Sequence, residues 1–154
     1  MAEAGSGKLE IASSQSSGPF ISDFSSWGPT PDLGIKPEIT AHGGNILSAV
    51  TGGSYDRLSG TSMACPNLAG LVVLLKQYVV ENFPDIASDN GKVTAMVYQL
   101  LMSTADIAFN TNGAPYAVRK QGAGLANLKA ALETTAYIST KDAEGNVMDK
   151  TKVE

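Results

Sequence analysis

The feature that most constrains this chain is residues 61–81, where apolar side chains fall on nearly every face of a helix. They are Met63, Leu68, Leu71, Val72, Val73, Leu74, Leu75, Tyr78, Val79 and Val80. A helix that is apolar all round belongs in the interior of a protein and not on its surface. The small residues Ala64, Ala69 and Gly70 allow neighbouring backbone to approach closely. The stretch therefore predicts a buried central helix.

Pro66 lies inside this predicted helix. Its ring nitrogen carries no hydrogen, so it cannot donate to the carbonyl of Ser62, four residues earlier. We expect the helix to bend, or to begin loosely, just after Ser62.

Shorter apolar segments between turn residues predict the remaining elements. They are strands at 8–12, 46–50 and 55–59 and helices at 92–103 and 125–133. Either Ser88 or Asp89 is suited to cap the helix at 92–103, because its side-chain oxygen accepts from free N–H groups. Together with the central helix, these elements predict an α/β fold.

We expect three parts along the chain. Residues 1–7 have the composition of a linker or an arbitrary start. Residues 8–135 hold the α/β pattern. In residues 136–154 a turn signal at 142–146 lies between short β-type segments, which predicts a hairpin and the start of a β-type unit.

Composition and charge exclude several functions. A net charge of −4 leaves no basic surface for nucleic acid. The single cysteine excludes an internal disulfide and a thiolate metal site. The longest apolar run, residues 71–75, is far short of the roughly 18 residues typical of a membrane span. We therefore expect no membrane span, no metal site and no cofactor, and the polar residues 1–7 are no signal peptide.

Residues 59–70, SGTSMACPNLAG, contain the most informative serine. A serine hydroxyl is a poor nucleophile unless a base removes its proton and the backbone holds it exposed. Gly60 permits a tight turn, and Ser62 then begins the helix, where free N–H groups and the helix dipole favour negative charge. The Ser62 N–H can donate to an oxyanion there. A plain helix N-cap is the alternative role of Ser62, and the two roles are compatible.

This segment resembles the active-site serine signature of the subtilisin-like serine peptidases. The matching positions are Gly60, Thr61, Ser62, Met63, Ala64, Pro66, Ala69 and Gly70. Residues 24–29 (FSSWGP) and 36–39 (KPEI) also look like this family, as do 100–105 and 121–127. The sequence of these segments is most similar to the lactocepin-like cell-envelope peptidases of Gram-positive bacteria.

The resemblance implies part of a subtilisin-like parallel-sheet domain, with a buried central helix after the nucleophile. It implies a serine endopeptidase that cleaves proteins or peptides through an acyl-enzyme on Ser62, with the Ser62 N–H in the oxyanion hole. It also implies that the parent protein is extracellular or belongs to the cell envelope.

His42 is the only histidine, and Asp23, Asp32, His42 and Ser62 follow the order of the family's triad. Their surroundings do not fit. The family's aspartate ends a hydrophobic strand and its histidine opens a helix, whereas His42 aligns with the proline of the family's Ala-Pro-Gly turn. Triads are recognised by geometry and not by order, and we expect His42 not to be the base.

In the family, the triad aspartate and histidine and the oxyanion-hole asparagine lie upstream of the matched segment. Too few residues precede Ser62 to hold them. We therefore expect this chain to be the C-terminal part of a catalytic domain, inactive alone, with the upstream part as its natural partner. Its uncovered central helix predicts self-association. The alternative is a non-catalytic remnant that binds a partner.

Three further features have plain structural interpretations. Cys65 follows Ser62 by three residues and suggests thiol regulation, but a small buried packing residue is the expected role. Trp27 is expected to be a partly buried loop anchor and not a cleft wall. The acidic residues of the C-terminal part have no calcium-loop spacing; they are Glu133, Asp142, Glu144, Asp149 and Glu154.

Overall fold

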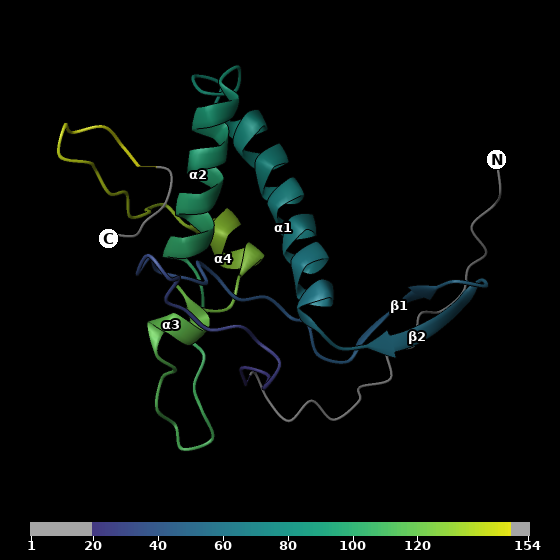
Figure 1. Cartoon of the computed structure of the whole chain (residues 1–154). Helices are drawn as coiled ribbons and strands as arrows, with labels where there is room; N and C mark the ends of the chain where they lie inside the picture. Colours follow the sequence, from purple (N-terminus) through teal and green to yellow (C-terminus); the bar gives the residue numbers. More distant parts are fainter. Residues whose placement is uncertain (1–19, 149–154) are drawn as a thin grey trace, which may run out of the picture.

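The computed structural model describes residues 20–148. They form six helices and strands, which are labelled in Figure 1. They are β1 (Ile46–Val50), β2 (Ser54–Leu58), α1 (Thr61–Asn82), α2 (Asn90–Ser103), α3 (Val118–Gln121) and α4 (Leu128–Glu133). The expected linker at 1–7 and strand at 8–12 lie outside the described residues.

Strands β1 and β2 form an antiparallel hairpin that extends away from the helices (Figure 1). Its register pairs Ile46 with Leu58, and its turn contains Gly52 and Gly53 at φ 93° and 75°. Since Val50 pairs with Ser54, the loop consists of the three residues 51–53. Three-residue hairpin loops place a residue in the left-handed region, where glycine is favoured. The strand predicted at 46–50 is confirmed, and the second strand begins one residue earlier than predicted.

The hydrophobic core lies where α1, α2 and α4 meet. Its buried members come from one side of each helix and are Leu75, Val79, Val93, Val97, Leu100, Leu101 and Ala131. Burying one large aliphatic side chain is worth about 1.5–3 kcal/mol, so this cluster is the main source of stability among the described residues.

The caps of α2 and α4 explain where these helices begin. Asp89 caps α2, because its Oδ1 accepts from the N–H groups of Gly91 and Lys92 at 3.0 and 3.2 Å. The helix predicted at 125–133 begins instead at Leu128, where Asn127 Oδ1 accepts from the Ala130 N–H at 2.9 Å. Leu125 is excluded from the helix because its backbone bonds to that of Asp106.

Helix α1 confirms the predicted helix at 61–81, but it is not covered on all sides by residues 20–148. Val73 and Leu74 keep 66% and 53% of their surface exposed, whereas Leu75 and Val79 are fully buried. By length and composition alone α1 also passes the test for a membrane-spanning helix, which core helices of soluble proteins pass too.

The structure is an α/β arrangement, as predicted. Within residues 20–148 the one regular sheet is the β1–β2 hairpin, and parallel pairing is limited to the isolated bridge between Thr40 and Leu125. The turn predicted at 142–146 is present: Lys141 and Val147 form an antiparallel bridge around it, and Asp142 accepts from Asn146.

Candidate active site

Ser62 is the second residue of α1, and its side chain is exposed. The N-cap is Gly60, which has no side chain to cap the helix, so Ser62 is not the cap. The Gly60 carbonyl accepts from the N–H groups of Met63 and Ala64 at 3.0 and 3.3 Å. These bonds close the first turn around Ser62 and hold its hydroxyl at the surface.

The N–H of Ser62 has no acceptor among residues 20–148. The first N–H groups of any helix lack an intrahelical partner, and the helix dipole gives this end a partial positive charge. A negatively charged oxygen near Ser62 therefore finds both a free donor and a favourable potential. This is the arrangement that an oxyanion needs.

The turn that carries Ser62 is bonded to an earlier turn of the chain. The Gly60 N–H donates to the Gly43 carbonyl at 2.8 Å, and Gly43 is buried. At the hairpin base next to it, the Ser59 hydroxyl accepts from the Asn45 N–H at 2.7 Å. Segment 43–45 thus holds the loop that leads into α1.

Three residues before Gly43, the backbone N–H and carbonyl of Thr40 are both hydrogen-bonded to the segment 121–126. The Thr40 N–H donates to the Gly124 carbonyl at 2.8 Å, and Thr40 accepts from the Ala126 N–H at 2.9 Å. The Thr40 hydroxyl donates to the Gln121 carbonyl at 3.0 Å. We call these three contacts the Thr40 clamp. Sequence reasoning missed it.

The glycines of segment 121–124 are the sequence signal for this clamp. Gly122 has φ 63°, and a Cβ there would lie 2.3 Å from the Glu38 carbonyl oxygen. The buried Gln121 side chain accepts from the Ala108 N–H at 2.7 Å and donates to the Tyr116 carbonyl at 2.6 Å. Only glycine allows the backbones to approach this closely.

His42 does not form a catalytic pair within the described residues. Its side chain is exposed and has no hydrogen bond or ion pair to any of residues 20–148, so neither Ser62 nor Asp23 is its partner. The expectation that His42 is not the base stays a prediction. Among the same residues no group of three or more His, Cys, Asp or Glu side chains is arranged to hold a metal ion.

The other residues of the signature surround Ser62 in different ways. Thr61 and Pro66 are exposed, and Met63 and Ala64 are half-buried. Helix α1 continues through Pro66. At Gly70 an added Cβ would meet no atom within 4 Å among the described residues, so the expected close backbone approach is not used there.

Two structural expectations for side chains are corrected or refined. Cys65 is exposed and not a buried packing residue, because none of residues 20–148 covers that side of α1. Trp27 is 55% exposed and anchors its loop to α3: Lys120 Nζ lies 3.6 Å from the indole centroid, and the Gly28 N–H donates to the Arg119 carbonyl.

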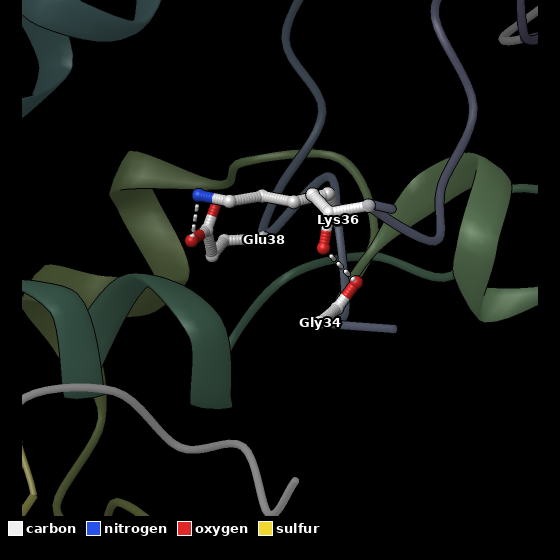
Figure 2. A network of polar contacts seen from close by, with 4 residues as sticks. Gly34, Lys36 and Glu38 are labelled. Carbon is white, nitrogen blue, oxygen red and sulfur yellow. Dashed lines mark hydrogen bonds and ion pairs between the residues drawn. The ribbon is translucent and has the colours of Figure 1, made fainter. Parts of the chain in front are cut away.

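A cavity of about 280 Å³ lies between segment 36–39 and helices α1 and α2. Its apolar lining is Ile39, Leu68, Val72, Tyr98, Leu101 and Met102. Lys36 and Glu38 also line it, and Figure 2 shows the Lys36 ammonium paired with the Glu38 carboxylate. Ser62 is not among the lining residues, so this cavity is separate from the serine.

Comparisons with known proteins agree with this geometry. Residues 8–124 match the model of the Subtilase family. The chain is 39% identical over 144 residues to a C5a peptidase of Streptococcus pyogenes, an alignment that covers 89% of this chain. It is 37% identical over 120 residues to a PII-type proteinase of Lacticaseibacillus paracasei, covering 73% of this chain.

Among solved structures, the chain resembles the prenylagaramide maturation protease PagA, with a TM-score of 0.55 and 28% identity. That similarity covers 73% of this chain and 37% of the other. The chain spans only 12% of the length of the C5a peptidase and 6% of the PII-type proteinase.

Proposed function

The chain belongs to the subtilase family, and from this premise we propose that it is part of a serine endopeptidase whose nucleophile is Ser62. The observation that carries the proposal is the position of Ser62: exposed, second in α1, and with a free backbone N–H. The longer protein that would contain this chain is called the parent protein below.

The proposed reaction begins when Ser62 Oγ attacks the carbonyl carbon of a peptide bond while a base takes the hydroxyl proton. The carbonyl oxygen becomes an oxyanion, which accepts a hydrogen bond from the Ser62 N–H. Collapse of the tetrahedral intermediate breaks the C–N bond, and the protonated base gives its proton to the leaving amine. Water then hydrolyses the acyl-enzyme by the same steps and restores Ser62.

We propose that the base is a histidine in the upstream part of the same catalytic domain, outside this chain. The unpartnered position of His42 supports this, because general-base assistance is typically worth about 10²–10⁴ in rate and requires hydrogen-bond reach. By itself the chain is therefore inactive. In the proposed domain arrangement, residues 8–135 belong to the catalytic domain and residues 136–154 begin a β-type unit.

The substrates proposed for the parent protein are proteins or peptides, and no cofactor takes part. The resemblance to lactocepin-like cell-envelope peptidases supports an extracellular or cell-envelope location. The similarity to a C5a peptidase and a PII-type proteinase supports the same substrate class.

An alternative is a non-catalytic module that binds a partner through the apolar side of α1, where Val73, Leu74 and Val80 are exposed. The two functions differ in what happens at Ser62. The experiment is to compare the parent protein with its Ser62→Ala variant on a peptide substrate. Complete loss of turnover supports the peptidase, whereas unchanged turnover contradicts the role of Ser62, and an inactive wild-type parent supports the binding module.

A further inference from the structure

Gly43 lies against the turn that carries Ser62, and we propose that it is a positioning residue for the peptidase reaction. The absence of a side chain at Gly43 sets the distance between its own turn and the first turn of α1. This inference rests on the proposed role of Ser62 as the nucleophile.

The space around Gly43 admits no side chain. A Cβ on Gly43 would lie 2.6 Å from the Gly60 carbonyl oxygen, 2.8 Å from Ala64 Cβ and 3.1 Å from the Ala64 nitrogen. Carbon atoms that are not bonded prefer separations of about 3.5–4.0 Å. A carbon and a carbonyl oxygen approach to about 3.3–3.6 Å, so the first two contacts are far too short. The Gly60 oxygen belongs to the backbone and cannot rotate away, so the two turns would have to separate.

Separation of the turns would move the reacting groups of Ser62. The Gly60 carbonyl that would be pushed accepts from Met63 and Ala64, the two residues that follow Ser62. The Gly60 N–H is also bonded to the Gly43 carbonyl at 2.8 Å. Because Ser62 lies between these anchored positions, its Oγ and its N–H would shift together with the turn.

Because of the Thr40 clamp, we expect the turn that carries Ser62, and not the turn that carries Gly43, to move. Two backbone bonds and one hydroxyl bond hold Thr40 to segment 121–126, three residues before Gly43. The start of α1 is less secured, because Gly60 provides no side-chain cap. A methyl group at position 43 would therefore displace the first turn of α1 more than the clamped segment.

Catalysis is sensitive to such a shift. Oxyanion donors act at about 2.7–3.1 Å from the developing charge. A misplacement of about 1 Å can cost on the order of 10²-fold in rate. Losing an interaction that is made only in the transition state lowers kcat without raising KM, so the loss should appear in kcat.

The experiment compares Gly43→Ala with Gly44→Ala in the parent protein, measuring kcat, KM and melting temperature. Gly44 is the matched control because it is exposed and a Cβ there would meet only Ser22 Oγ, at 3.9 Å. We expect Gly43→Ala to lower kcat by about 10- to 100-fold with KM within about threefold of wild type. Gly44→Ala should keep both values. Equal kcat in the two variants overturns the inference.

A second pair of variants serves if Gly43→Ala does not fold. In an Ala64→Gly background the contact at 2.8 Å is absent, whereas the contacts with the Gly60 oxygen and with the backbone nitrogen of residue 64 remain. There Gly43→Ala should still lower kcat, by less than in the wild-type background, and no decrease overturns the inference. Ser62→Ala distinguishes failure of the proposed function from failure of the role of Gly43. If Ser62→Ala retains activity, the proposed function is contradicted. If Ser62→Ala is inactive but Gly43→Ala is fully active, only the role of Gly43 is contradicted.

Discussion

His42 is not hydrogen-bonded to Ser62, although the turn that carries the histidine is bonded to the turn that carries the serine. The carbonyl of Gly43, the next residue after His42, accepts from the Gly60 N–H at 2.8 Å. The imidazole itself is exposed and unpartnered among residues 20–148. Although the two turns are bonded to each other, Ser62 and His42 therefore form no nucleophile–base pair among the described residues.

The first prediction separates these two residues in the parent protein. Ser62→Ala should abolish turnover, because no other hydroxyl can form the acyl-enzyme. His42→Ala should keep kcat within several-fold of wild type, because His42 has no hydrogen-bond partner in the part of the chain that the structure describes. Steady-state kinetics on a peptide substrate measures both, and comparable losses of kcat from the two changes would show that His42 is the base.

The second prediction concerns the exposed side of α1 in the isolated chain. Leaving several large apolar side chains in water removes an amount comparable with a typical domain stability of about 5–15 kcal/mol. We expect the isolated chain to self-associate or to stay partly molten. Light scattering with thermal melting tests this, and a monodisperse monomer with a sharp transition would contradict it.

A charged substitution on this side should reduce the association. Val73→Lys places a charge where the valine is 66% exposed. Val118→Lys is the matched control, because Val118 is 58% exposed but lies on α3. Only Val73→Lys should increase the monomer fraction.

The third prediction uses the N-cap of α2. The backbone N–H of Lys92, foremost among several donors, lowers the pKa of Asp89 from its ordinary value of 3.8. A lowered folded-state pKa means that the stabilisation is present above the unfolded pKa, near 3.8, and is lost as the pH falls through the folded value. Amide protection at Gly91 and Lys92, corrected for intrinsic exchange, should therefore fall in strongly acidic solution.

Asp89→Asn supplies the control for this effect, because asparagine caps a helix nearly as well but does not titrate in this range. Its protection at Gly91 and Lys92 should change less with pH than that of the wild type. An equal acid-induced loss in both proteins would assign the effect to some other carboxyl group.

The fourth prediction tests the close approach of Gly122 to Glu38, beside the Thr40 clamp. In Gly122→Ala, an alanine has to adopt the positive φ of 63°, and its Cβ would lie 2.3 Å from the Glu38 carbonyl oxygen. Gly113→Ala has a similar φ of 76° but meets nothing within 4 Å. Left-handed backbone alone costs about 1–2 kcal/mol for a residue with a side chain. Gly122→Ala should therefore lower the melting temperature of the parent protein clearly more than Gly113→Ala. Equal decreases would show that Gly122 is not tightly packed against Glu38.

Local patterns predicted much of this fold. The strand at 46–50, the long helix after Gly60 and a cap at either Ser88 or Asp89 depend on short-range chemistry. The structure contains the strand and the helix, and of the two cap candidates it uses Asp89. The pattern at 125–133 failed because Leu125 pairs with Asp106 and Thr40, contacts that no local propensity contains. Cys65 is exposed for a related reason, since burial depends on which distant segments cover a helix.

The candidate site was predictable only in part. The signature around Ser62 identified the nucleophile candidate, because the chemistry requires a fixed local sequence. The support behind it was not identified, since Gly43 meets Gly60, and Thr40 meets Gln121, across long stretches of chain. Gly122 and Gly124 were the available signal, but glycine alone does not tell which backbone it approaches.

The most direct test of the central claim is covalent labelling with a fluorophosphonate probe, followed by peptide mass spectrometry. In the parent protein we expect one stoichiometric adduct, on Ser62, and none in the isolated chain, because activation of the hydroxyl requires the upstream base. Labelling of a different residue in the active parent would contradict the assignment of Ser62 as nucleophile. Stoichiometric labelling of Ser62 in the isolated chain would contradict the upstream base.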